Sequence, residues 1–476
     1  MAYALQLDVF ETVRLMNDLP IRSAAQTPRG DRPCSAPSTR RPFRATALAL
    51  ASLGFAVITA HSVARAGPVG DAPDLLQAPL TPEAFTEAVI TRNASLEAMR
   101  QAVVAATARI KPAGALEDPM LSVSAAPRTF GSATGAMGDI EISQALPWWG
   151  TLDARTEVAR AEAEAATQDV DALRLRVAAL ARGAFSDWVF IHRALDINAA
   201  NEGVLGELRN IARVRYTTGQ APQEDVLQAD VQRTMLRQQR LELERQRKVI
   251  QARMNALLDR SPQEAMPQPA GLPDVVTLPA EELLAERALT HPQLRELQAE
   301  ESAAQAREHL QEKERYPKFG VSAGYNNMWS DPAQRPMVGL SITLPIDQEK
   351  YRAAIDAAHA QARRSAAALE DQRAMVLADL ATAYASTREA AQSLALYRNE
   401  LVPLARTTLE VARSEYGSGR GDFLNVLTAE QRRLDTELGL ARMESEYYQR
   451  LAQLEQTSGG GLLTNPDRVQ IEGETR

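Results

Sequence analysis

Residues that could do chemistry are few in this sequence, and they form no catalytic or metal-binding pattern. The 476-residue chain has five histidines, His61, His192, His291, His309 and His359, none in an HExxH motif or four positions from another, so no zinc site is predicted. The single cysteine, Cys34, permits neither a disulfide framework nor a thiolate metal site. No glycine-rich phosphate-binding loop is present, and Glu162 and Glu164 are expected to be solvated helix residues. We therefore predict no enzyme, no cofactor and no metal.

One pattern of polar and aromatic residues does recur, at two stretches that lie two hundred positions apart. Residues 212–229 and 412–429 share Ala212, Arg213, Tyr216, Gly219, Val226, Leu227 and Ala229 with Ala412, Arg413, Tyr416, Gly419, Val426, Leu427 and Ala429. In both, a long helix-forming run stops at a glycine-containing turn and another run begins. We interpret each stretch as the tip of a helical hairpin. Polar residues beside such turns commonly cap or pack the helices.

The rest of the chain repeats in the same way. Eight residues recur 198 positions later: Leu80, Glu83, Leu96, Pro119, Val123, Ser143, Leu146 and Pro147 match Leu278, Glu281, Leu294, Pro317, Val321, Ser341, Leu344 and Pro345. The offset grows to 200 at the tips, so about two residues are inserted in the second half. This period indicates a duplicated domain, because solenoid repeats are much shorter. We predict a first repeat over 67–260, a proline-rich linker over 261–279, a second repeat over 280–458 and a tail over 459–476.

Each repeat is predicted to contain the same elements in the same order, in a mostly α-helical fold with a pair of β-hairpins. A helix comes first, over 82–110 and 280–314, and opens at Thr81-Pro82 in the first repeat. A β-hairpin follows, over 117–147 and 317–346. A long helix then runs to the tip, over 150–217 and 348–417, and a helix returns over 222–259 and 422–457. At 1.5 Å per residue the long helices span roughly 100 Å.

The predicted strands have one apolar and one small or polar face. Phe319, Val321, Ala323 and Tyr325, then Val338, Leu340, Ile342 and Leu344, alternate with small or polar residues. Four strands cannot close a membrane barrel, and open edges are not tolerated in lipid. Three chains would supply twelve strands, with Ser322, Gly324, Asn326, Gly339, Ser341 and Thr343 lining a wet lumen. Trp148, Trp149 and Trp329 fall at strand ends, where they either form an aromatic girdle at the lipid interface or simply pack. Trp188 lies mid-helix and is expected to pack.

The charge of the chain and its N-terminal sequence indicate what the protein can bind and where in the cell it is located. The formal net charge is −8, and without the first 66 residues 45 basic and 57 acidic residues remain, which disfavours nucleic-acid binding. Arg40, Arg41 and Arg44 precede an apolar run over 45–60, and Ala64-Arg65-Ala66 offers a cleavage site. Residues 1–66 are therefore predicted to hold a secretory signal peptide, the alternative being an uncleaved anchor.

Taken together, these features resemble the TolC family of outer-membrane efflux channels. The residues that carry the resemblance are the run Ser143-Gln144-Ala145-Leu146-Pro147-Trp148-Trp149-Gly150, the tip run Arg215–Gly219 and Asp225-Val226-Leu227, together with the duplication. The resemblance implies a homotrimer in the outer membrane of a Gram-negative bacterium, with a twelve-stranded β-barrel continuous with an α-helical barrel in the periplasm. It also implies a periplasmic adaptor (a membrane fusion protein) and an inner-membrane pump of the RND type, and the run Leu146-Pro147-Trp148-Trp149-Gly150 resembles the heavy-metal branch of these systems. The duct itself would be a passive conduit for solutes such as metal ions or drugs.

The same resemblance assigns a gate to the tips. Asp225 matches a carboxylate of the family's closed-state lock and Tyr416 matches its tyrosine partner. The lock arginine of the family falls at Gly421, and the neighbouring Arg420 is the candidate substitute. The acidic pore rings of the family fall at Asn425 and Thr428, so those rings are absent, and Asp422 is the candidate for the remaining negative charge. Tyr216, Gly219 and Gly419 in the tip turns are predicted to contact the adaptor.

The main alternative is a coiled-coil scaffold or a periplasmic adaptor protein without a channel. Long helices with sparse, small apolar positions suit coiled-coil packing equally well. Adaptors, however, carry one helical hairpin between β domains, whereas this sequence predicts two matching hairpins with alternating strands. A scaffold would be extracted by salt, and a membrane barrel would need detergent.

Overall fold

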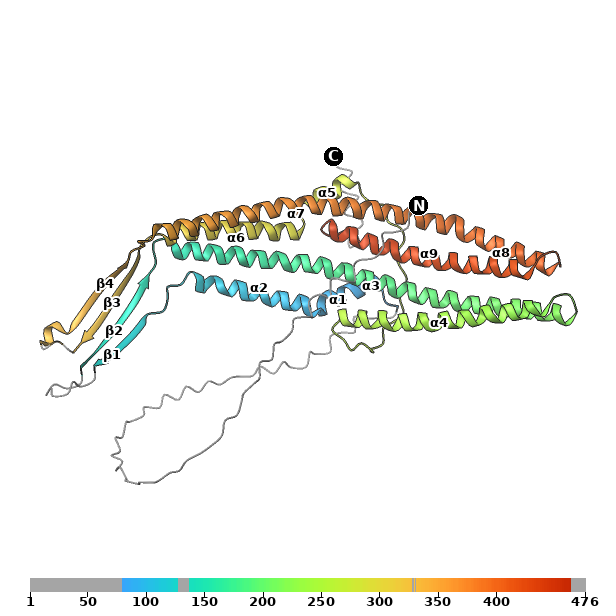
Figure 1. The fold of residues 1–476 in the computed structure, drawn as a ribbon, viewed down its shortest axis with the longest axis horizontal. Helices are drawn as coiled ribbons and strands as arrows, with labels where there is room; N and C mark the ends of the chain where they lie inside the picture. The colour runs from blue at the N-terminus through green and yellow to red at the C-terminus, as the bar shows by residue number, and fades with distance from the viewer. Residues whose placement is uncertain (1–78, 127–136, 328, 330, 464–476) are drawn as a thin grey trace, which may run out of the picture. The chain divides into compact units, whose positions relative to one another are not determined.

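The computed structural model describes residues 79–126, 137–327, 329 and 331–463, and the predicted signal peptide lies outside them. The helices are α1 (Pro82–Arg92), α2 (Ala94–Ala113), α3 (Thr151–Thr217), α4 (Gln223–Leu257), α5 (Glu281–Ala288), α6 (Pro292–Glu314), α7 (Gln348–Leu396), α8 (Val402–Gly417) and α9 (Phe423–Thr457). The strands are β1 (Met120–Ala126), β2 (Met137–Leu146), β3 (Lys318–Asn326) and β4 (Pro336–Thr343), with a 3-10 turn at Pro332–Gln334. Within residues 69–476, the strands lie at one end of the long helices and the two hairpin tips at the other (Figure 1).

The first helix of each half is broken in two, where the sequence predicted a single helix over 82–110 and over 280–314. Asn93 ends α1 with extended backbone, and its side-chain oxygen accepts hydrogen bonds from the N–H groups of Ser95 and Leu96 at the start of α2. His291, 198 positions later, caps α6 in the same way, accepting from the N–H of Gln293 at 3.1 Å. Both breaks arise because a side chain that can cap a helix N-terminus competes with continuation of the helix. The predicted cap at Thr81 is present, accepting from Ala84 N–H at 3.2 Å.

The four strands form one antiparallel sheet in the order β1-β2-β3-β4. Their register places apolar residues opposite one another across all four strands; for example, Leu121 pairs with Ile142, Ile142 with Ala323 and Ala323 with Val338. The alternate face carries the predicted small and polar residues, with Ser143 opposite Ser322 and Ser322 opposite Gly339. Among the described residues, β1 and β4 each pair along one edge only. The sheet therefore has one apolar face, one small or polar face and two open edges.

The long helix α3 is the element against which both halves pack. It spans 67 residues, close to the predicted bounds, and lies against α2, α4, α6 and α9. A buried cluster near its middle contains Phe85, Phe185 and Trp188, whose indole N–H donates to the Pro267 carbonyl at 2.9 Å. A second cluster joins Leu208 and Ala229 of the first half to Val426 of the second half. The two repeats thus share the buried cluster that lies next to the tips.

The second long helix is interrupted by a π-helical segment, Tyr397–Leu401, between α7 and α8. Buried positions of α3 recur 199 residues later in α7, where Val177 and Ala181 correspond to Val376 and Leu380. At the tips the offset is 200, so one extra residue is accommodated between α7 and the end of α8. A π-helical turn closes with one residue more than an α-helical turn, which makes this segment the site of that insertion. The sequence predicted an unbroken helix over 348–417, which is wrong because the π-helical segment interrupts it.

Candidate functional site at the hairpin tips

The two tip turns have the same backbone conformation. Gly219 and Gly419 adopt φ values of 72° and 78°, in the left-handed region that favours glycine. The next residue in each turn donates its N–H back to the helix, Gln220 to the Arg215 carbonyl at 2.8 Å and Arg420 to the Glu415 carbonyl at 3.0 Å. These bonds satisfy carbonyls that the ends of α3 and α8 would otherwise leave unpaired. The repeated sequence therefore produces a repeated turn.

Tyr416 and Asp225, which the sequence predicted to pair, are in contact. The Tyr416 hydroxyl donates to Asp225 Oδ2 at 2.9 Å, which joins α8 to α4. Both side chains are removed from solvent, with Tyr416 4% and Asp225 7% exposed. The Tyr416 ring also packs against Phe423, with ring centroids 5.2 Å apart. Burial, followed by the hydrogen bond to Asp225, raises the pKa of Tyr416 well above its ordinary range, so the hydroxyl remains a donor.

The arginine at this contact is Arg215 and not Arg420. The Arg215 guanidinium lies over the Tyr416 ring, 4.4 Å from its centroid, and donates to the Tyr416 backbone carbonyl. A cation at this position also lies at the C-terminal end of α8, where it is electrostatically favourable. Arg420 is exposed, and its side chain makes no hydrogen bond or ion pair within the part of the chain that the structure describes. Arg215 stands in the quoted tip run, but only the packing of one hairpin on the other shows which arginine meets Tyr416.

Asp422, the remaining predicted gate residue, lies at the start of α9, next to the positions where gate residues of the family are missing. Asp422 is its N-cap, with Oδ1 accepting from the N–H of Leu424 at 3.3 Å, and its side chain is exposed. Gly421 contacts the preceding helix so closely that an added Cβ would lie 3.0 Å from the Tyr416 nitrogen. No larger side chain fits that position without a shift of the turn. Asn425 and Thr428 are both exposed.

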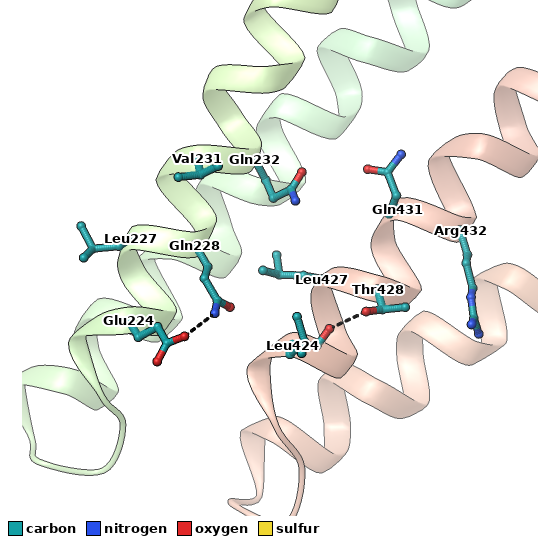
Figure 2. Close-up of a pocket in the computed structure, with 10 residues that line it drawn as sticks. All are labelled: Glu224, Leu227, Gln228, Val231, Gln232, Leu424, Leu427, Thr428, Gln431 and Arg432. Atoms are coloured by element: carbon teal, nitrogen blue, oxygen red, sulfur yellow. Dashed lines mark hydrogen bonds between the residues drawn. The ribbon is translucent and has the colours of Figure 1, made fainter.

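A groove of about 480 Å³ lies between α4 and α9 beside the tips (Figure 2). Its walls are Glu224, Leu227, Gln228, Val231 and Gln232 on α4, and Leu424, Leu427, Thr428, Gln431 and Arg432 on α9. Figure 2 shows Leu427 pointing from α9 toward α4, whereas Leu227 points away from α9. The Gln228 amide donates to Glu224 at 2.9 Å along the α4 wall.

A buried polar cluster, which the sequence did not predict, lies further along the same helices. Arg433 of α9 binds Glu430 at 2.9 Å and Glu437 at 2.7 Å, and it also donates to Asn201 of α3. The hydrogen bonds that Arg433 donates to Glu430 and Glu437, together with the negative charge of these carboxylates, raise the pKa of Arg433 despite its burial. Arg406 of α8 reaches Glu437 at 3.0 Å. The cluster fixes α8 and α9 against α3 below the tips, and its acidic and basic residues are too common on helices to single out by sequence.

At the opposite end of the helices, aromatic residues gather where β2 ends and β3 begins. Trp148 stacks on Tyr316 with centroids 4.9 Å apart, and Trp149 meets Phe319 edge-on at 5.6 Å. Trp149 and Trp329 are both exposed, and Trp329 lies between β3 and β4. Among the described residues, no group of three or more His, Cys, Asp and Glu side chains is arranged to hold a metal ion. None of the described helices is both long and apolar enough to cross a membrane.

Comparison with known proteins assigns the fold and the family. Residues 86–260 and 283–460 match the model of the outer membrane efflux protein family. The chain belongs to that family. Membership makes it an outer-membrane protein that serves as an exit duct for efflux, and this rules out the scaffold and adaptor alternatives. No curated protein sequence matches the chain.

Solved structures of outer-membrane channels share the fold of this efflux protein. The outer-membrane channel OprN aligns over 80% of this chain and 90% of its own, with a TM-score of 0.70 and 21% identity. CusC, described in terms of folding and transmembrane channel formation, gives a TM-score of 0.71 at 17% identity, over 80% of this chain and 92% of its own. The open state of the Neisseria gonorrhoeae outer-membrane channel MtrE gives a TM-score of 0.67 at 17% identity, over 80% of this chain and 89% of its own. At these identities the likeness concerns the fold.

Proposed function

We propose that three copies of this efflux protein form one passive duct, in which the sheets close a twelve-stranded barrel and the helices form a periplasmic tube. The observation that carries the proposal is the four-stranded sheet, whose apolar face is exposed and whose two edges are unpaired within the described chain. Val338, at the centre of β4, is 91% exposed. An apolar face of this kind suits lipid, and only closure with further strands removes the edges.

The polar face of the sheet would then line the lumen. Ser322, Gly339 and Ser341 give a wall of small side chains, and Asp139 and Glu141 of β2 add negative charge to the same face. Trp149 and Trp329, near opposite ends of the strands, would lie in the two interfacial aromatic girdles. This wall needs no catalytic group, because a duct works by excluding lipid and admitting water.

The tip contact would hold the periplasmic end closed. Tyr416, Asp225 and Arg215 join the two hairpins of one chain through a buried, charge-assisted contact, and exposed Arg420 and Asp422 would face the aperture. A periplasmic adaptor that contacts the turns at Gly219 and Gly419 would release it. The energy for transport would come from an inner-membrane pump of the RND type, which would also select the cargo.

Two measurements on the purified full-length protein test this proposal. Its mass in detergent should correspond to three chains, and the same preparation should give discrete conductance steps in a planar lipid bilayer. Heat-denatured protein is the control for nonspecific leakage. A monomer in detergent, or a trimer without conductance, would refute the duct.

A further inference from the structure

The two hairpins of one chain meet through faces that are not equivalent. Hairpin A (α3–α4) offers Asp225 and Arg215, and hairpin B (α8–α9) offers Tyr416. Leu427 of hairpin B belongs to the same buried cluster as Leu205 and Leu236 of hairpin A. Because the hairpins are repeats of one sequence, hairpin A also has a tyrosine face like that of hairpin B, and hairpin B has a face that corresponds to the Asp225 face of hairpin A. The contact within the chain uses neither of these two faces.

The unused faces are visible in the exposure of matched residues. Tyr216 is 45% exposed where its counterpart Tyr416 is 4% exposed. Leu227 is 56% exposed where Leu427 is 6% exposed, and Figure 2 shows Leu227 directed away from α9. On hairpin B, Asn425 is exposed where Asp225 is buried. Tyr216 and Leu227 are thus exposed on hairpin A, and Asn425, the hydrogen-bond acceptor that corresponds to Asp225, is exposed on hairpin B.

We infer that Tyr216 of one chain inserts against Asn425 and Glu415 of a second copy, repeating between chains the contact that Tyr416 makes with Asp225 and Arg215 within one chain. A contact between unlike faces of identical chains is heterologous, and it closes into a ring when the rotation per chain permits. The inference rests on the proposed trimer and adds to it the residues of the seam between subunits.

The seam has different chemistry from the contact inside the chain. Asn425 is a neutral acceptor in place of a carboxylate, and Glu415 stands where Arg215 provides a cation. The hydrogen bond across the seam is therefore between neutral groups, and such bonds are weaker than charge-assisted ones. The ring of tips would alternate between three charge-assisted hydrogen bonds within chains and three neutral Tyr216–Asn425 hydrogen bonds at the subunit boundaries.

Site-specific photo-cross-linking of the full-length protein in detergent tests this inference. Tyr216→p-benzoylphenylalanine should, on illumination, give adducts of twice the chain mass on a denaturing gel. Trypsin cuts after Arg413, Arg420 and Arg432, so the partner peptide should be 421–432, which contains Asn425, or 414–420, which contains Glu415. The matched control, Tyr416→p-benzoylphenylalanine, should give an adduct of single-chain mass with the peptide 216–233, which contains Asp225.

The outcomes separate the seam from the trimer itself. Interchain adducts on 421–432, or on 414–420, in a three-chain particle support the seam. A three-chain particle whose Tyr216 adducts fall elsewhere, or do not form, overturns the seam and leaves the trimer intact. A single-chain particle overturns both. If the photo-probe at position 216 prevents assembly, Asn425→p-benzoylphenylalanine in the native chain should label the peptide 216–233 of a neighbour.

Discussion

Removing the Tyr416 hydroxyl should open the periplasmic end. Tyr416→Phe keeps the ring contacts with Arg215 and Phe423 and deletes only the donor to Asp225. It leaves a carboxylate that is 7% exposed without that hydrogen bond. The loss of a hydrogen bond to a charged group costs about 2 kcal/mol. Three copies acting together would shift the closed-to-open equilibrium by about 6 kcal/mol, or about twenty-thousandfold as an upper limit.

The assay is single-channel recording in planar bilayers, comparing conductance and open probability at fixed voltage and salt. Asp225→Asn keeps an acceptor and should lie between the native protein and Tyr416→Phe, since a neutral hydrogen bond contributes about 1 kcal/mol. Tyr351→Phe is the control, because the Tyr351 hydroxyl makes no hydrogen bond in the described part of the chain. Equal open probability in native protein and Tyr416→Phe would refute the lock.

Three further predictions concern other parts of the chain. Burial lowers the pKa of His291, so the unfolded chain takes up a proton at a higher pH than the folded chain; stability should be full above about pH 6.5 and decline below it. His291→Asn, which keeps a cap without a titrating ring, should flatten that acid decline in the thermal midpoint. Deleting Asn399 should remove the π turn and leave the trimer assembled, whereas deleting Ala199 from the matched stretch of α3 should rotate the tip by about 100° and prevent assembly. Glu415→Arg with Asn425→Asp copies the charged contact into the seam and should raise the temperature at which the trimer dissociates in SDS, each seam gaining about 1 kcal/mol.

Each of these three predictions would be contradicted by a specific result. An unchanged acid slope in the asparagine variant would show that another group controls stability at low pH. If both single-residue deletions destroy the trimer to the same degree, the π segment is not the site of the insertion. A transplanted contact that lowers the dissociation temperature would contradict the proposed neighbours of Tyr216.

How far the sequence predicted the site depended on whether the interaction was local. The tip turns and the alternating strand faces follow from residue type and spacing within a few positions, and the structure shows both. Tyr416 and Asp225 were paired through family resemblance, and the structure shows the contact. The sequence offers Arg420 for the lock, whereas the arginine in contact with Tyr416 is Arg215. Which of the two meets Tyr416 depends on how far one hairpin is displaced along the other. Residue type carries no information on that displacement.

The breaks in the first helix of each repeat, unlike the choice of arginine, could have been predicted from the sequence. Asn93 and His291 are 198 positions apart, the same offset as the other matched residues of that region. A capping side chain at both positions, followed by Pro292 in the second half, indicates a helix start. The π segment gave a weaker signal, because it changes the offset between matched residues of the two repeats by only one residue, within a long helix. It becomes clear only when the buried positions are known.

The two unpaired edges of the sheet have a consequence for the order of events in biogenesis. A chain holds its helices and its two strand hairpins by itself, but in the proposed trimer β1 and β4 acquire their remaining partners only from other molecules. The final step of folding would then be of higher than first order in protein, and slower as the protein is diluted. Until that step, an apolar face and two hydrogen-bonding edges stay open to unrelated proteins. Yield should thus depend on how quickly newly exported chains meet, and a chaperone that shields these edges would raise it.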